Sequence, residues 1–317
     1  MTAFWFPAWP RSRVAILRTA LYLFVVVDVL WATGFVAPHG DVPGGLYQPL
    51  FIGRVLPLPT PTPLLVAGIQ VVLVVAALVA AAGRLSRVAG WLVFALYLEW
   101  MVIAFSYGKV DHDRFGFLVA LAVLPTVGLA RWGDDERDER AGWALRAIQV
   151  AVVATYFLAA WAKLRYGGLE WVNGSTLTRA IVRRGTFLSD PLLDVPVVLQ
   201  ATQYGIIAFE LASPLLLVPG RWGRRMLGLA VAFHLVTFAS ITIIFLPHVM
   251  CLLAFLPLEK IRAVGSGWKP PQFDRTNDQR EARAASTMRR TARPKAASTA
   301  GGRPAAKSSR NDRSWST

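Results

Sequence analysis

Three ionisable residues stand next to long apolar runs and could do chemistry. Lys163 lies in a run that begins at Trp143, His112 lies in the short loop KVDHDR, and His248 directly follows Pro247. A lysine acts as a general base only when its pKa is lowered, which burial in an apolar environment achieves. The same side chains would be inert if they lay at the headgroup level with their polar ends in water. Their spacing alone leaves both interpretations open.

Polar residues recur along the run that contains Lys163. Gln149, Tyr156 and Lys163 are spaced seven residues apart, nearly two helical turns, so they share one face of a helix. A lysine on such a face is costly inside a membrane and is usually given a partner or a task. Gly167 and Gly168 follow and turn the chain back toward Trp171. We therefore expect Lys163 at the mouth of an intramembrane cavity.

Other apolar runs also carry polar groups. They hold Asp28, Glu99, Glu210 and His234. Gln203, Glu210 and Ser213 fall on one helical face, and such groups in lipid must be paired or neutralised. A structural alternative is therefore a set of interhelical hydrogen bonds, for example between Glu210 and His234.

The composition indicates the elements that must position these residues. Of the 317 residues 55% are hydrophobic, and they gather in long runs with few charges, as in a multi-pass membrane protein. An all-α bundle of about eight transmembrane helices is the predicted fold. The runs cover about residues 14–36, 63–82, 88–107, 115–130, 143–175, 195–218, 226–243 and 246–258.

Arginines predict the orientation of this bundle. They cluster before the first run and in alternate loops, so the positive-inside rule places both termini in the cytoplasm. The segment 163–194 breaks the rule, because it holds five cations on the outer side, and we expect it to pack back over the bundle. The outer segment 37–62 is rich in proline and glycine and predicts an ordered, turn-rich loop that carries His39.

Residues 1–262 form the predicted transmembrane domain, and residues 263–317 a disordered, basic, cytoplasmic tail. The net charge is +15, and the tail is of low complexity, so it cannot bury a core. Joined to a membrane bundle, it favours anionic lipid headgroups over nucleic acid as a partner. The single cysteine, Cys251, excludes an intramolecular disulfide, and four scattered histidines supply no metal-ligand spacing.

Three elements of the sequence resemble one known family. The first is Tyr156-Phe157, then Ala159-Ala160, Lys163-Leu164, and Glu170-Trp171-Val172 with Gly174, which resembles Y-F-x-A-G-x-x-K-L…W-x-x-G. The second is Phe233-His234 followed by FLPHVM, and the third is SYGKVDHDRFGFL. These elements are similar to those of the horizontally transferred transmembrane (HTTM) domain family, which includes the vitamin K-dependent gamma-carboxylases.

The resemblance implies a cell-membrane protein with an outer-leaflet cavity for a small lipophilic molecule, of which a quinol is the candidate. It implies that Lys163 is a general base in a carboxylase- or epoxidase-like reaction and that His112 lies near it. We expect the following residues to bind the substrate: Tyr156, Trp171, Glu210, His234 and His248.

Two further interpretations belong to other classes of protein. In the first, the chain is a non-catalytic membrane scaffold or assembly partner, Lys163 is paired and protonated, and the polar faces serve helix packing. In the second, it is a transporter, which the absence of a fixed-period internal repeat disfavours. Whether the chain is an enzyme is therefore left open at this point.

Overall fold

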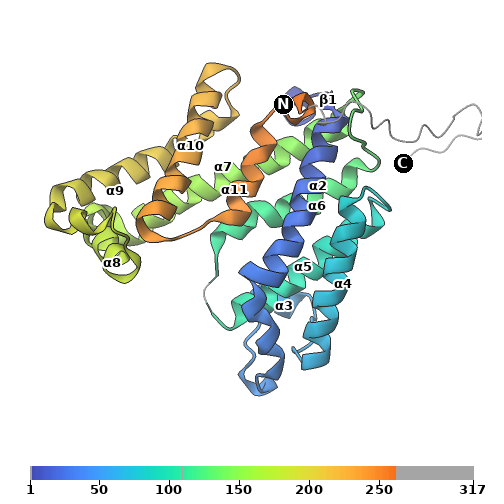
Figure 1. Cartoon of the computed structure of the whole chain (residues 1–317), viewed down its shortest axis with the longest axis horizontal. Helices are drawn as coiled ribbons and strands as arrows, with labels where there is room; N and C mark the ends of the chain where they lie inside the picture. The colour runs from blue at the N-terminus through green and yellow to red at the C-terminus, as the bar shows by residue number, and fades with distance from the viewer. Residues whose placement is uncertain (1, 109, 262–317) are drawn as a thin grey trace, which may run out of the picture. The chain divides into compact units, whose positions relative to one another are not determined.

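The computed structural model describes residues 2–108 and 110–261, and these are mostly helical (Figure 1). The predicted tail lies outside the described residues. The helices are α1 (Thr2–Trp5), α2 (Arg11–Val27), α3 (Phe51–Val55), α4 (Pro63–Ala81), α5 (Val88–Ser106), α6 (Phe115–Val127), α7 (Glu139–Gly167), α8 (Ser175–Arg184), α9 (Pro196–Leu211), α10 (Arg221–Ile241) and α11 (Leu246–Leu252). Strands β1 (Trp9–Pro10) and β2 (Arg137–Asp138) form one short antiparallel pair.

Short 3-10 and π segments join or extend these helices. A π turn, Asp28–Ala32, extends α2. The 3-10 segments are Gly34–Asp41, Gly44–Leu46, His112–Arg114, Gly168–Val172, Asp190–Asp194, Ser213–Leu217, Leu253–Phe255 and Leu258–Lys260. The loop 37–62 is therefore ordered, as predicted, and contains the short helix α3.

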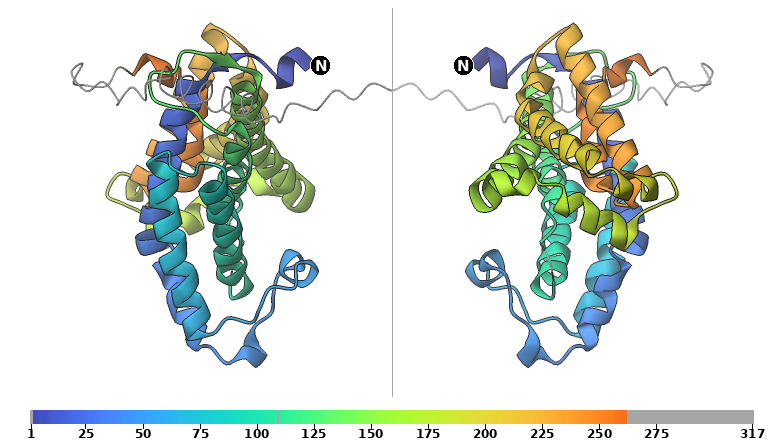
Figure 2. Two further views of the ribbon diagram at one scale, coloured as in Figure 1. Left: turned by 90° about the vertical axis from the view of Figure 1, so that its right-hand side faces the viewer. Right: turned by 90° about the vertical axis from the view of Figure 1, so that its left-hand side faces the viewer.

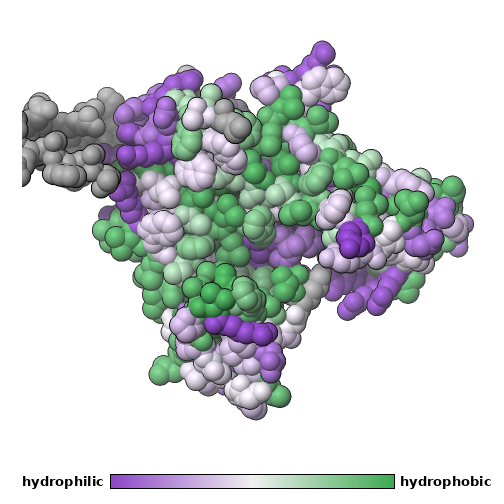
Figure 3. Space-filling view, turned by 180° about the vertical axis from the view of Figure 1, so that it is seen from behind, coloured by the Kyte–Doolittle hydropathy of each residue, from purple (hydrophilic) through white to green (hydrophobic). Residues whose placement is uncertain are grey.

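The described residues contain five helices that are long and apolar enough to cross a membrane. They are Arg11–Ala32, Pro63–Ala81, Val88–Ser106, Glu139–Val172 and Arg221–Ile241. Hydrophobic side chains cover much of the outside of these helices (Figure 3). Leu64, Val71 and Trp161 illustrate this surface, because each is more than half exposed although it is apolar. Such a surface suits lipid rather than water, and the prediction of a membrane protein is confirmed at this level.

The other three predicted spans coincide with shorter helices. They correspond to α6, which has 13 residues, α9, which has 16, and α11, which has 7. A helix needs roughly 20 residues to cross the hydrocarbon core. Leu253–Phe255 lengthens α11 to the apolar helix Leu246–Phe255. The structure thus places helices at all eight predicted runs, and five of them reach the length of a span.

Local chemistry sets the ends of the central helix α7. Asp138 caps its start, since the Asp138 carboxylate accepts a hydrogen bond from the backbone N–H of Arg140 at 2.8 Å. The helix ends at Gly167, and the residue that caps it, Gly168, has a φ of +58°, which a residue with a side chain would rarely adopt. The chain then returns through Gly168–Val172, as the glycine pair predicts. This return brings Trp171 back beside the last turns of α7.

Two groups of helices lie on either side of α7. Helices α2, α4, α5 and α6 pack together on one side, with Tyr22, Tyr97, Trp100 and Phe117 fully buried among them. Helices α8, α9 and α10 lie on the other side (Figures 1 and 2). Helix α11 contacts both groups as well as α7. Helix α7 is thus the element shared by both halves.

The segment 163–194 packs against its neighbours, as expected from its cations. Helix α8 contacts α9 and α10. The hydroxyls of Thr186 and Ser189 donate hydrogen bonds to the backbone carbonyls of Ala239 and Ser240, at 2.7 and 2.6 Å. The segment is therefore fastened to the end of α10.

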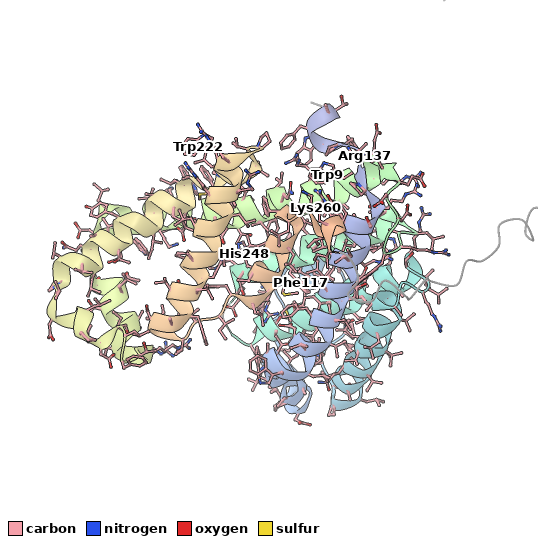
Figure 4. The ribbon with its side chains drawn as sticks, turned by 45° about the horizontal axis from the view of Figure 1, so that its top comes forward. Trp9, Phe117, Arg137, Trp222, His248 and Lys260 are labelled. Carbon is pink, nitrogen blue, oxygen red and sulfur yellow. The ribbon has the colours of Figure 1, made fainter. Side chains whose placement is uncertain are left out.

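The arginine-rich ends of the helices gather together. Figure 4 shows Trp9, Arg137, Lys260 and Trp222 toward one end of the bundle, with His248 and Phe117 nearer its middle. Ion pairs join this end: Arg11 to Glu136 and Asp138, each at 2.8 Å, and Arg13 to Glu259 at 2.5 Å. The loops that the charge pattern assigned to one side are thus at one end of the fold.

One buried ion pair lies inside the first group of helices. The Asp28 carboxylate accepts hydrogen bonds from the Arg114 guanidinium at 2.7 Å and from the Tyr97 hydroxyl at 2.8 Å. The Asp28 side chain is fully buried and that of Arg114 is 10% exposed. The structural interpretation of Asp28 fits these contacts, because the carboxylate ties α2 to α5 and to the start of α6.

We predict that Asp28→Ala destabilises the fold by about 3–5 kcal/mol, because it leaves the Arg114 guanidinium buried without its carboxylate. The control is Glu136→Gln, which breaks an ion pair whose carboxylate is 63% exposed and should cost less than about 1 kcal/mol. Thermal unfolding of the detergent-solubilised variants measures both. Equal losses in the two variants would contradict the role assigned to Asp28.

Candidate functional site

Lys163 forms an ion pair with Glu210. The Lys163 ammonium on α7 lies 2.5 and 2.7 Å from the two carboxylate oxygens of Glu210 on α9. The Lys163 side chain is 23% exposed and that of Glu210 is 7% exposed. Because both groups lie among apolar side chains, each neutralises a charge that would be costly alone.

Trp171 completes the surroundings of Lys163. The ammonium lies over the Trp171 ring, 5.2 Å from its centroid, in a cation–π contact. Gln203 on α9 donates a hydrogen bond to the Trp171 carbonyl at 2.5 Å. The turn after α7 and the polar face of α9 therefore hold Trp171 against the lysine.

A second cluster lies on the same face of α7, two turns before Lys163. The Tyr156 hydroxyl and the Nε2 atom of His234 on α10 are hydrogen-bonded at 2.6 Å. The His248 ring on α11 meets the Tyr156 ring edge to face at 4.5 Å between centroids. The His234 and His248 ring centroids are 5.5 Å apart. Three helices thus bring one phenol and two imidazoles together.

Phenylalanine rings surround this cluster. Phe209 and Phe233 stack at 4.8 Å between centroids, and Phe209 also meets Tyr156 edge to face at 5.1 Å. Phe245 lies 5.6 Å from the His234 ring. The rings make the cluster apolar, so any hydrogen bond formed there gains strength from the low local dielectric.

His248 lacks a hydrogen-bond partner among the described residues. It is 2% exposed, and neither of its ring nitrogens is bonded. His234 uses Nε2 for Tyr156, while its Nδ1 is also buried and unbonded in the described part of the chain. A buried, unpaired polar group costs about 1–3 kcal/mol. The cluster can therefore supply hydrogen bonds to a small polar group that enters it.

His112 lies at the edge of this second cluster. Its ring is 6.3 Å from that of Phe245, and it interacts electrostatically with His248. Lys163, by contrast, contacts Glu210 and Trp171. The structure thus places His112 near the histidines, and its expected place near Lys163 stays a prediction.

The carboxylate of Asp113 is a further group that the sequence reasoning did not single out. It is 8% exposed in the 3-10 turn His112–Arg114, which packs against α11. Burial raises its pKa from 3.8 to about 6, a shift that neighbouring Arg114 opposes. The loop KVDHDR contains Asp113, but only its histidine, His112, was predicted to be functional.

A pocket of about 400 Å³ is formed by residues that follow Trp171 in the sequence. It is lined by Asn173, Gly174, Ser175, Thr178, Arg179, Val182, Pro196 and Leu199. This volume falls within the range of small-molecule sites. The pocket adjoins the turn that holds Trp171, since Gln200 donates a hydrogen bond to the Asn173 carbonyl at 3.3 Å.

The predicted site residues therefore fall into two clusters joined by α7. One contains Lys163, Trp171 and Glu210, and the other Tyr156, His234 and His248, with His112 at its edge. The example of a bond between Glu210 and His234 does not hold, because Glu210 pairs with Lys163 and His234 with Tyr156. In the described residues, no group of three or more His, Cys, Asp or Glu is placed to hold a metal ion.

Comparison with known proteins adds no relative to this geometry. No family model matches the chain, and no curated protein or solved structure matches it. The resemblance to the HTTM family thus rests on the sequence elements quoted above.

We predict that Lys163 and Glu210 are energetically coupled by about 1–3 kcal/mol. Lys163→Met and Glu210→Gln should each destabilise the protein, because each leaves a charge without its partner, and the double variant should lose less than their sum. Thermal unfolding in detergent measures all three. The matched control pairs Lys163→Met with Glu170→Gln, since Glu170 is an exposed carboxylate in the turn that follows α7. Additive losses for Lys163 and Glu210 would contradict the pair.

We also predict a pH dependence from Asp113. Its raised pKa means that the folded state favours the protonated carboxyl, so this stabilisation is present below pH 3.8 and is lost as the pH rises through about 6. Asp113→Asn mimics the protonated form and should melt at a higher temperature than the wild type above pH 6, with the difference shrinking toward pH 4. The exposed Asp41→Asn serves as the control. Parallel curves for wild type and Asp113→Asn would refute the assignment.

Proposed function

We propose that the chain is an integral membrane protein of HTTM type that binds a small lipophilic molecule bearing a hydroxyl group, such as a quinol. The proposal includes eight spans with both termini in the cytoplasm. The motif residues support it, as does the gathering of arginines at one end of the helices. The proposed ligand site lies in the half of the bundle made by α7, α9, α10 and α11.

The observation that carries the proposal is the unpaired, buried His248 beside the Tyr156–His234 bond. Buried polar groups normally have partners, and those without one mark places where a ligand or an ordered water completes the bonding. A quinol hydroxyl both donates and accepts a hydrogen bond, and its ring suits walls made of Phe209, Phe233 and Phe245. The cluster therefore matches the ligand in polarity and in its aromatic surroundings.

In the enzymatic form of the proposal, Lys163 takes a proton from the quinol hydroxyl opposite the one that His248 bonds, because Lys163 lies two helical turns of α7 beyond the Tyr156 cluster. An ammonium cannot accept a proton, so Lys163 must first give one to Glu210, whose carboxylate oxygens lie 2.5 and 2.7 Å away. The resulting neutral amine then accepts the hydroxyl proton, and the ligand becomes an anion beside a protonated lysine. Glu210 is thus the group that would prepare Lys163 as a base.

A scaffold or assembly role is the second candidate, and a specific observation favours it. The polar residues on the shared face of α7 already have partners: Gln149 donates to the Ala254 carbonyl at 2.9 Å, Tyr156 bonds His234, and Lys163 pairs with Glu210. Each contact joins α7 to another element, as helix packing requires. The two candidates differ at His248, for which packing supplies no bond in the described residues.

We predict that duroquinol, a small quinol without a tail, raises the melting temperature of the purified wild-type protein in a saturable way. His248→Phe should abolish the shift, because phenylalanine fills the space without offering a nitrogen. The matched control is His39→Phe in the outer loop, where His39 stacks on Tyr107 at 4.5 Å between centroids. That variant should keep the shift.

A wild-type protein that shows no shift with duroquinol, or equal losses in the two histidine variants, would favour the scaffold role. A separate comparison addresses catalysis. Lys163→Ala should leave quinol binding largely intact while removing any quinol-dependent reaction. In the proposal Lys163 accepts the proton, whereas His248 binds the ligand.

A further inference from the structure

A second pocket lies at the arginine-rich end of the helices, away from the two clusters. Its volume is about 490 Å³. Four parts of the chain form it: the start of α2, the turn between α4 and α5, the end of α6, and the start of α7. The lining residues are Arg11, Leu85, Ser86, Arg87, Val88, Val127, Gly128, Leu129, Asp138 and Arg140.

The three arginines of this pocket are not equivalent. Arg11 is neutralised, because its guanidinium binds both Glu136 and Asp138 at 2.8 Å. No carboxylate among the described residues forms an ion pair with Arg87 or Arg140. With one aspartate and three arginines, the lining carries a net charge of +2. The charge still available to a ligand therefore comes from Arg87 and Arg140.

The backbone carbonyls beside this pocket already accept hydrogen bonds from other residues. The Gly128 carbonyl accepts hydrogen bonds from the Ser86 hydroxyl at 3.1 Å and from the Arg18 guanidinium at 3.0 Å. Arg18 also donates to the Ala130 carbonyl at 2.8 Å. The Arg87 guanidinium lies against Gly128, since a Cβ built there would be 3.0 Å from the Arg87 Nε atom. Because the carbonyls are already bonded, the polar groups left for a ligand are chiefly the N–H donors of arginine.

Apolar side chains border the same pocket. Leu85, Val88 and Leu129 are about 70% exposed, and all three line it. They lie at the ends of apolar helices, next to the arginines. A soluble anion would gain nothing from these side chains, whereas the glycerol and first acyl carbons of a lipid would bury them. The pocket thus combines unpaired cations with an apolar border.

We propose that this pocket binds the phosphate headgroup of an anionic phospholipid. Arg87 and Arg140 donate to the phosphate oxygens, and Leu85, Val88 and Leu129 contact the upper part of the acyl chains. Planar guanidinium groups suit phosphate through paired N–H donors. Basic pockets between transmembrane helices on the cytoplasmic side are suited to such headgroups. The site is independent of the quinol proposal, because none of its residues belongs to the two clusters.

The test is native mass spectrometry of the full chain with added phosphatidylglycerol or phosphatidylcholine. We expect the wild type to retain phosphatidylglycerol selectively. Each arginine near a membrane surface contributes about fivefold, so Arg87→Ala/Arg140→Ala should bind phosphatidylglycerol about 30-fold more weakly. The matched control is Arg221→Ala/Arg224→Ala, which removes two arginines from the first turn of α10, outside the pocket. It should retain nearly all of the binding.

Three outcomes would overturn the proposal. Equal losses in the two double variants would show that diffuse positive charge attracts the lipid. Equal retention of both lipids would remove the role of headgroup charge. Displacement by millimolar glycerol 3-phosphate would identify a soluble phosphate as the occupant.

A milder variant covers the case in which the double variant does not fold. Arg140→Ala alone changes one exposed side chain and should weaken phosphatidylglycerol binding about fivefold. Unchanged binding in that variant would also count against the site.

Discussion

A charge buried inside this bundle is stabilised by a partner, and two ion pairs between helices meet this requirement. An unpaired ion in an apolar interior costs several kcal/mol even after relaxation. Asp28 and Arg114 satisfy the requirement between α2 and the start of α6, and Lys163 and Glu210 satisfy it between α7 and α9. The first pair belongs to the group of helices on one side of α7. The second ties the other group to α7 itself.

Helix α7 connects these two environments. Its polar face carries Gln149, Tyr156 and Lys163, whose partners lie on three different elements: Ala254, His234 and Glu210. A spacing of seven residues keeps the face aligned over several turns. One helix can therefore hold several other segments in register without placing any of these groups in lipid.

The sequence predicted these faces because periodicity depends only on helical geometry. The stripe of Gln203 and Glu210 on α9 continues to Ser213 in the 3-10 segment that follows. It faces α7 and the turn after it, since its members bond Trp171, Lys163 and Val153. The return of the chain after Gly168 was predictable for a similar reason, because paired glycines permit a sharp turn. In each case, a local rule was sufficient.

Local rules of this kind did not predict which residues pair with one another. Asp28 and Arg114 are 86 residues apart, and nothing in their local sequence links them. The sequence suggested His234 as an example partner for Glu210, but in the structure Tyr156 bonds His234, and Lys163, two turns further along α7, pairs with Glu210. The raised pKa of Asp113 likewise depends on its burial beside α11, which no spacing within KVDHDR encodes.

The pairing of Lys163 does not by itself decide between a base and a packing element. A strong ion pair stabilises the ammonium and so opposes proton abstraction, but the same carboxylate offers the nearest acceptor for the lysine proton. What separates the two roles is the rest of the cluster. Packing alone gives no reason to bury an imidazole with both nitrogens unbonded in the described residues, whereas a ligand hydroxyl would use them. His248, rather than Lys163, is therefore the residue on which the functional interpretation of this fold depends.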